Sequence, residues 1–247
     1  MRKGLHPRKP RTRRAIAKMT ELPPSKFFPP AALAGADGLV FFGGRLTPDW
    51  LVDAYSQGIF PWPFSPDDTI LAWWSPDPRA IIEFDALHVP RRLLRSIRSE
   101  RFTVTCDRDF SGVIQGCATA QHRPGNTWLG PAMIRAYERM FELGIAHSVE
   151  AWHEGRLVGG TYGLSIGGLF SAESMFYAIS DASKIALVHL ITHLKARGYV
   201  LLDIQQLTPH TARFGARTIP RDEYLARLAC AIRLPIKFGE KLDGKVS

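Results

Sequence analysis

The sequence predicts an α+β protein, with a small N-terminal α/β domain followed by a larger domain built on a mostly antiparallel sheet flanked by helices. Three strand-like runs follow one another over residues 147–177, separated only by the turns HEG and GG. A helix, an apolar strand and a final helix then follow over residues 181–234. By contrast, residues 23–85 consist of short aromatic runs broken by proline and glycine, which indicates a separate small unit.

The positive charge of the chain is confined to its first residues. The net charge is +9, but residues 1–20 hold eight Lys or Arg and no acid, which leaves 24 basic and 23 acidic residues elsewhere. We therefore predict that residues 1–22 form a basic, disordered arm. This arm could steer the protein toward RNA phosphates, serve as a targeting peptide, or result from a misassigned start with Met19 as the true first residue.

Composition also indicates the cellular compartment of the protein and the state of its cysteines. No apolar run approaches the roughly 20 residues of a membrane helix, and no secretory segment is recognisable, so we expect a cytoplasmic protein without a membrane partner. Cys106, Cys117 and Cys230 are widely spaced and form no CxxC pair. We interpret them as reduced thiols rather than as metal ligands or a disulfide framework.

The small domain is predicted over residues 23–85, and the proline-rich segment LPPSKFFPP (22–30) is interpreted as the linker that leads into its fold. A strand-like run, GLVFFGGRL, leads to a helix for which Thr47 is the expected N-cap and Pro48 the first residue. Gly58 is placed to end this helix. Two short apolar runs around a Ser-Pro-Asp-Pro turn complete the unit over residues 70–84.

The larger domain is predicted over residues 86–247. It begins with a basic helix (90–98), a short strand (102–106) and two further helices, the second starting near Pro131 and ending at Gly144. The three strands, the helix of residues 181–198 and the next strand then give the order β-β-β-α-β-α. This order is similar to that of the GNAT acyltransferases, which bind coenzyme A.

One feature argues against coenzyme A as the acyl donor. In a GNAT acetyltransferase, a glycine-rich turn before the main helix holds the pyrophosphate of the cofactor on backbone N–H groups. The corresponding segment here, YAISDASKIAL, has no glycine. It also places Asp181, the predicted N-cap, where phosphate would have to bind.

Three polar residues are candidates for the chemistry. Asp203 and Gln205 follow four apolar residues on one strand and point to the same face. Glu173 lies among small and apolar residues on the preceding strand, and a buried unpaired carboxylate is costly. The group could be a solvated polar end of the sheet, but the pair beside Glu173 favours a functional site.

Tryptophans in loops form a second group of candidates. Trp62 and Trp128 lie in segments that contain Pro, Gly or Asn. A tryptophan in such a position either belongs to the core or stacks on a nucleobase.

Several motifs in order resemble the leucyl/phenylalanyl-tRNA–protein transferase family, from about Phe27 to the last helix. The motifs are GIFPW (58–62), WWSPDPR (73–79), TW (127–128), AHSVE (146–150), LVGGTYG (157–163), ESMF (173–176), DASK (181–184), D-I-Q (203–205) and H-T-A-R-F-G-A (210–216). Together they are specific, although each alone is weak.

The resemblance implies an enzyme that transfers Leu, Phe or Met from aminoacyl-tRNA to the α-amine of proteins that begin with Arg or Lys, marking them for degradation through the N-degron pathway. It implies a monomer that uses no cofactor and no metal. The family's catalytic positions fall on Asp203, Gln205 and Glu173, and its aromatics for the 3′-terminal adenosine on Trp62 and Trp128. The aminoacyl side-chain pocket falls on Thr161, Leu187, Leu190, Leu194 and Leu202.

Three alternatives remain open at this stage. A related aminoacyl-tRNA transferase could differ in its amino acid or acceptor, and Thr161 stands where the family commonly has a larger apolar residue. An ordinary acetyltransferase would bind coenzyme A. A non-catalytic RNA-binding protein would keep its function after the substitution Asp203→Ala.

Overall fold

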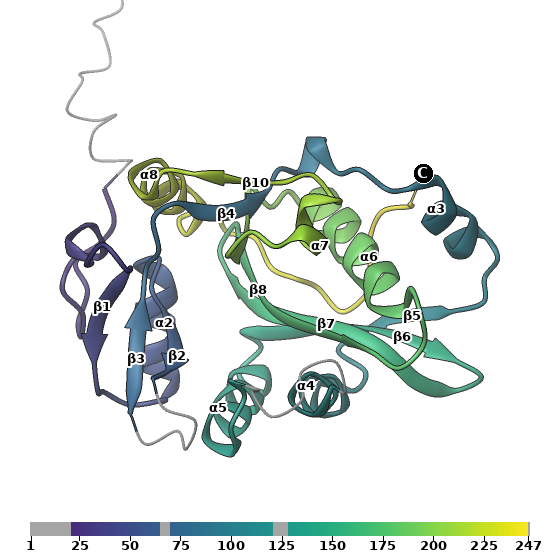
Figure 1. Ribbon diagram of the computed structural model, residues 1–247, viewed down its shortest axis with the longest axis horizontal. Coiled ribbons are helices and arrows are strands. Elements are labelled where there is room, and N and C mark those ends of the chain that lie inside the picture. The colour runs from purple at the N-terminus through teal and green to yellow at the C-terminus, as the bar shows by residue number, and fades with distance from the viewer. Residues whose placement is uncertain (1–20, 65–69, 121–127, 247) are drawn as a thin grey trace, which may run out of the picture.

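The computed structural model describes residues 21–64, 70–120 and 128–246, and the predicted arm of residues 1–22 lies almost wholly outside them (Figure 1). Two sheets are present in the described residues. The small sheet has the strand order β1-β3-β2, and the large sheet has the order β10-β4-β9-β8-β7-β6-β5. Only β8 and β9 pair in parallel; the other neighbours pair antiparallel. The predicted α+β class with a mostly antiparallel sheet is confirmed.

The small unit contains η1 (Ala31–Leu33), β1 (Leu39–Phe42), α2 (Pro48–Ser56), β2 (Phe60–Pro63) and β3 (Leu71–Trp74). Helix α2 begins at Pro48 as predicted, but the side chain of Thr47 makes no capping hydrogen bond. Gly58 follows the helix with a left-handed φ of 73°, a conformation that favours glycine. Leu51 and Tyr55 on α2 are buried against the rest of the chain.

Strand β4 (Arg79–Ile82) corrects one expectation about this unit. The predicted small domain, residues 23–85, includes this strand, but β4 pairs with β9 (Leu201–Gln205) on one side and β10 (Ala216–Ile219) on the other. It therefore belongs to the large sheet. The sequence did not predict β10, the partner that makes β4 an internal strand.

The large sheet is completed by β5 (Thr103–Cys106), β6 (Ala146–His153), β7 (Arg156–Ile166) and β8 (Leu169–Tyr177). The parallel pairing of β8 with β9 covers three residue pairs and ends at Ser171 and Asp203. Strand β8 continues to Tyr177 without β9 beside it. The sheet therefore opens between β8 and β9 beyond Ser171 and Asp203. These two strands flank α6 in the chain, as in the order of elements expected from the sequence.

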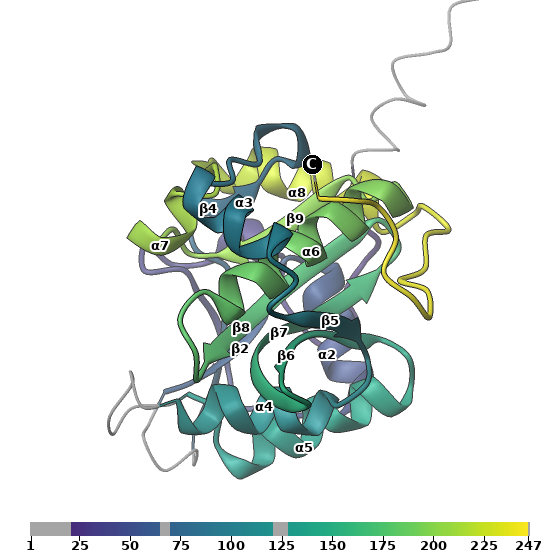
Figure 2. The ribbon, with the colours of Figure 1, turned by 90° about the vertical axis from the view of Figure 1, so that its right-hand side faces the viewer.

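Helices cover both faces of the large sheet (Figures 1 and 2). Helix α6 (Ala182–Arg197) packs on β6, β7 and β8 from one side, whereas α4 (Phe110–Thr119) and α5 (Pro131–Glu142) pack from the other. Gly144 and Gly198 follow α5 and α6 with left-handed φ angles, as predicted. The predicted N-cap Asp181 also has a left-handed φ of 71°, and its carboxylate pairs with Lys184 instead of capping the helix.

Three shorter helical elements and the last helix complete the described chain. Helix α3 (Arg91–Arg98) is the predicted basic helix, and α8 (Arg221–Ala231) is the predicted final helix. The sequence did not predict η2 (Phe84–Ala86) or α7 (Pro209–Ala212).

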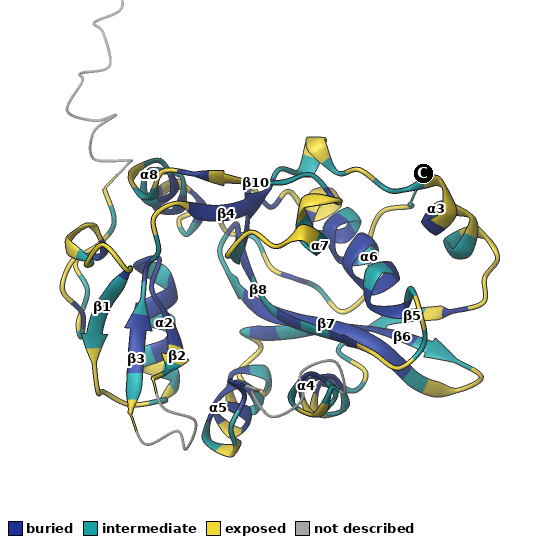
Figure 3. Cartoon of the chain, in the orientation of Figure 1, coloured by how far each residue is buried: buried dark blue, intermediate teal, exposed yellow. Residues whose placement is uncertain are grey.

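The small unit shares its core with the large one. Leu51, Tyr55 and Trp73 of the small unit belong to the same buried cluster as Met133 and Tyr137 of α5. Figure 3 shows buried segments on both α2 and α5. Because burial of apolar area is the main force that holds elements together, the two units keep a defined relative position, which matters for the site between them.

Candidate active site

A cavity of about 400 Å³ opens where β8 and β9 separate. Its apolar wall comes from β4, β8, α6 and β9, and polar groups gather at the remaining side. The lining residues used below are Ile82, Thr161, Glu173, Met175, Leu187, Ile204, Gln205 and His210. Glu173 and Gln205 thus meet at the cavity, whereas Asp203 is not among its lining residues.

Two β-bulges aim the polar residues. Between β7 and β8, Tyr162 pairs with Ser174 and Gly163 with Ala172, which leaves Glu173 as the unpaired residue. Between β4 and β9, Ala80 pairs with Gln205 and Ile81 with Asp203, which skips Ile204. A bulge turns a side chain away from the regular alternation of the strand and is common beside active sites.

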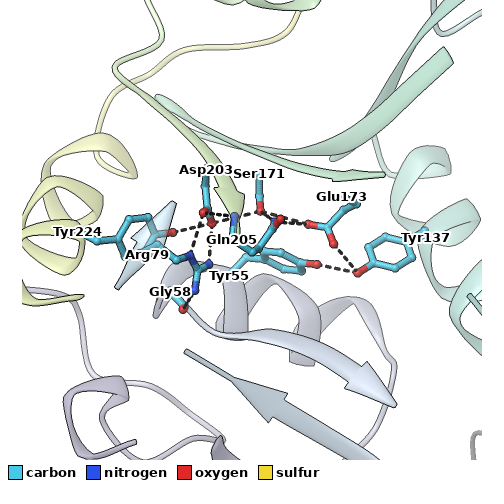
Figure 4. A network of polar contacts seen from close by, with 9 residues as sticks. All are labelled: Tyr55, Gly58, Arg79, Tyr137, Ser171, Glu173, Asp203, Gln205 and Tyr224. Carbon is cyan, nitrogen blue, oxygen red and sulfur yellow. Dashed lines mark hydrogen bonds and ion pairs between the residues drawn. The ribbon is translucent and has the colours of Figure 1, made fainter. Parts of the chain in front are cut away.

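Glu173 accepts hydrogen bonds from three neutral side chains (Figure 4). The Tyr137 hydroxyl donates to Oε2 at 3.3 Å, and Ser171 Oγ and Gln205 Nε2 donate to Oε1 at 3.1 and 3.2 Å. Burial, together with the nearby charge of Asp203, raises the pKa of Glu173 to about 7, and hydrogen bonding with Tyr55, Ser171 and Tyr137 opposes that shift only in part. No cation of the described residues pairs with Glu173, so its carboxylate is suited to a cationic group from a substrate.

Asp203 has the opposite surroundings. It is completely buried and forms an ion pair with Arg79, whose Nε and Nη2 donate to Oδ1 and Oδ2 at 2.8 and 2.6 Å. The Tyr224 hydroxyl donates to Oδ2 at 2.9 Å, and the Gln205 backbone N–H donates to Oδ1 at 3.0 Å. These donors use the acceptor capacity of the carboxylate, so Asp203 is held in place away from the cavity.

Gln205 connects the two carboxylates. Its Nε2 donates to Ser171 Oγ at 2.8 Å as well as to Glu173. Since an ionised Glu173 can only accept hydrogen bonds, the amide must turn its nitrogen toward it, which leaves Oε1 for another partner. The backbone of Gln205 has a left-handed φ of 56°, an uncommon conformation for a residue with a side chain.

The two predicted nucleobase-binding tryptophans lie side by side. The rings of Trp62 and Trp128 stack with centroids 5.1 Å apart and planes at 18°. Trp62 is 44% exposed, whereas Trp128 is buried and meets Tyr137 edge to face. A ring inserted between them would need a separation of about 7 Å, so a base has room only on the open face of Trp62 unless the pair parts.

The predicted side-chain pocket is brought together only in part. Thr161 and Leu187 line the cavity, and the Thr161 hydroxyl donates to the Ser174 carbonyl at 3.0 Å. The other three predicted positions do not line the cavity, although they are buried in the same apolar cluster as Leu187: Leu190, Leu194 and Leu202. Ile82, Met175 and Ile204 take their places on the lining.

Sequence reasoning missed five of the polar residues around the site. These are Tyr55, Arg79, Tyr137, Tyr224 and His210. The Nε2 of His210 is buried with no hydrogen-bond partner in the described part of the chain. Arg79 carried a usable signal, because a single arginine directly precedes the apolar run AII. The tyrosines carried none, since buried tyrosines are common in any core.

The opened, mostly antiparallel sheet fits the acyltransferase-like order of elements expected from the sequence. Comparisons with known proteins name the family. The sequence model described as "Leucyl/phenylalanyl-tRNA protein transferase" matches residues 81–229, and the model of that family's N-terminal domain matches residues 44–77. The chain belongs to this family, and it is accordingly an aminoacyltransferase.

Curated relatives agree over most of the chain. A leucyl/phenylalanyl-tRNA–protein transferase of Nitratidesulfovibrio vulgaris is 53% identical over 86% of this chain and 90% of its own length. The relative of Chromohalobacter salexigens is 50% identical over 83% of this chain and 79% of its own length. That of Anaeromyxobacter sp. is 49% identical over 87% of this chain and 91% of its own length.

The described residues contain no helix that is long and apolar enough to span a membrane.

Proposed function

We propose that the protein transfers Leu, Phe or Met from aminoacyl-tRNA to the α-amine of proteins that begin with Arg or Lys, and so produces a destabilising N-terminus. We further propose that it acts as a monomer in the cytoplasm, where aminoacyl-tRNA is made. Family membership supports the reaction. The observation that carries the proposal is the half-buried carboxylate of Glu173, which lines an apolar cavity and is paired with no cation of the described residues.

The cavity suits an unbranched or γ-branched apolar side chain. Its walls from Ile82, Met175 and Leu187 offer only apolar contact, and one methylene in such a pocket is worth about 1–3 kcal/mol. Leu, Phe and Met are therefore all accepted, while β-branched Val loses contact. Glu173 binds an ammonium group, either the α-amine of the donor or that of the acceptor.

The reaction is the aminolysis of an ester, so the donor needs no further activation. The neutral α-amine attacks the carbonyl carbon, a C–N bond forms, and the bond from that carbon to the ribose oxygen breaks. Gln205 orients the amine through Oε1, because its Nε2 is already held by Ser171 and Glu173. The vicinal ribose hydroxyl of the tRNA gives its proton to the leaving oxygen and takes up the proton that the attacking amine loses, so the products are the amide and the free ribose hydroxyl.

Incubation of the protein with radiolabelled Leu-, Phe-, Met- or Val-tRNA and peptides that begin with Arg, Lys, Asp or Ala tests the proposal. We expect label on the Arg and Lys peptides from the first three donors and little from Val-tRNA. Label confined to Asp or Ala peptides would show a related transferase with a different acceptor. Absence of label on every peptide would refute the transfer reaction.

A further inference from the structure

A single arginine joins the small unit to the strand that carries Gln205. Arg79, on β4, is 1% exposed, and its guanidinium lies 4.9 Å from the ring centroid of Phe60 and 4.6 Å from that of Tyr224. Two of its nitrogens bind the two oxygens of Asp203 in the bidentate arrangement that is strongest for this pair. Its Nη1 donates to the carbonyl of Gly58 at 3.0 Å, directly after α2 (Figure 4).

The pairing with Arg79 sets what Asp203 can do. Burial opposes the charged form of Arg79, but Asp203 and Tyr224 outweigh it and raise the pKa of the guanidinium above its ordinary value. The guanidinium of Arg79 therefore stays charged in its buried position. Asp203 already accepts hydrogen bonds from Arg79, Tyr224, the Gln205 backbone and Ser171 Oγ. Because it does not line the cavity, it does not contact a substrate proton directly.

What remains for Asp203 is to hold Gln205. The backbone N–H of Gln205 donates to Asp203 Oδ1 across the bulge where β4 shifts its register against β9. The left-handed φ of Gln205 is unfavourable for a residue with a side chain, so the surrounding contacts must maintain it. This conformation aims the amide at Ser171 and Glu173.

We propose that Arg79 is a positioning residue of the transfer reaction, which acts through Asp203 to keep Gln205 in its left-handed conformation and its amide at the cavity. The same guanidinium holds Gly58, so the small unit and the Gln205 strand keep one relative placement. Tyr224 supports the arrangement from α8. The proposal rests on the role of Gln205 in the proposed function.

The test is a double-mutant cycle between Arg79→Lys and Gln205→Ala. Lysine keeps the charge but not the planar fork, so Asp203 loses its bidentate hold. We expect Arg79→Lys to lower kcat about ten- to hundredfold while the KM for the donor changes less than about threefold. In the Gln205→Ala protein the same substitution should change kcat less than about threefold. An equal loss in both backgrounds would overturn the proposal, because Arg79 would then act without Gln205.

A milder variant keeps the test informative if Arg79→Lys unfolds. Tyr224→Phe removes one hydroxyl from Asp203, and we expect a smaller loss of kcat that again disappears in the Gln205→Ala background. Arg217→Lys is the matched control, because Arg217 lies on the edge strand β10 and pairs there with Glu83 at the surface. A kcat loss from Arg217→Lys as large as that from Tyr224→Phe would also contradict the proposal.

A structural readout separates this proposal from the proposed function. The side-chain amide signals of Gln205, assigned by NMR through their loss in Gln205→Ala, should shift in Arg79→Lys and Tyr224→Phe but not in Arg217→Lys. Unchanged signals would overturn the positioning role. All rates are measured with the donor and acceptor that the unmodified protein uses best, so a different acceptor preference would refute the proposed function and leave this test intact.

Discussion

The hydroxyl of Tyr137 donates a hydrogen bond of 3.3 Å to Glu173 and lies 2.6 Å from the hydroxyl of Tyr55. Because Tyr137 has one proton to donate, Tyr55 must donate to it. Tyr55 belongs to α2 of the small unit, and Tyr137 to α5 below the large sheet. The carboxylate at the cavity is thus held by a chain of hydroxyls that begins in the other unit.

Glu173→Gln should separate function from folding. The amide keeps the size of the carboxylate but cannot stabilise an ammonium group, so we expect transfer to fall about a hundredfold or more. Initial rates of transfer to the best acceptor peptide measure this. Glu142→Gln removes an exposed carboxylate and serves as the control. If Glu173→Gln destabilised the fold but left the transfer rate per folded molecule unchanged, the role of Glu173 would be structural and not functional.

The raised pKa of Glu173 makes a prediction about stability and pH. The folded carboxyl keeps its proton up to about pH 7, whereas its ordinary pKa is 4.5. Between these values the folded state binds more protons than the unfolded state, so the contribution of Glu173 to the free energy of unfolding falls as pH rises and then stays level. We expect Glu173→Gln to be more stable relative to the unmodified protein at pH 8 than at pH 5. Urea unfolding at both pH values checks this, and an equal difference would contradict it.

Tyr137→Phe should move the pH dependence of transfer. The Tyr137 hydroxyl lowers the pKa of Glu173 by hydrogen bonding to its charged form. Without it, the carboxylate forms at higher pH, so the acid side of the pH–rate profile shifts upward. Tyr199→Phe is the control, because its hydroxyl bonds Ser165 away from the site. An unchanged profile in Tyr137→Phe would show that Glu173 does not need to be ionised for transfer.

Thr161→Met should narrow the choice of donor. Thr161 lines the cavity from β7, and methionine would fill part of its volume. We expect kcat/KM for Phe-tRNA to fall about tenfold relative to Leu-tRNA. Thr161→Val keeps the volume but loses the hydrogen bond to Ser174, which makes it the control. The same change of preference in Thr161→Val would mean that lost hydrogen bonding, not volume, is the cause.

Trp62→Ala should weaken binding of the donor with little effect on stability. A stacked base gains about 1–3 kcal/mol from an aromatic side chain, so the donor KM should rise about ten- to hundredfold. Trp128→Ala should in addition lower the melting temperature, because Trp128 is buried against Tyr137. An unchanged donor KM in Trp62→Ala would remove Trp62 from the binding site.

Local signals predicted most of the fold. Pro48 begins α2, and Gly144 and Gly198 follow their helices with left-handed backbone, because these residue types have conformational preferences that act within a few residues. Asp181 shows the limit of such signals. Its side chain pairs with Lys184 rather than with the helix N–H groups. Both partners are close in the sequence, and the sequence pattern does not show which of them the carboxylate prefers.

The sequence by itself determined the α+β class, the family through its motifs, and the presence of Glu173, Asp203 and Gln205 on neighbouring strands. Only the tertiary structure decided their different surroundings. Arg79 and Asp203 are 124 residues apart in the chain, and the bulges at Glu173 and Gln205 depend on partner strands. A pKa and a side-chain direction follow from everything packed around a group. Asp203 is therefore paired and sealed, while Glu173, linked to it through Ser171 and Gln205, faces the cavity (Figure 4).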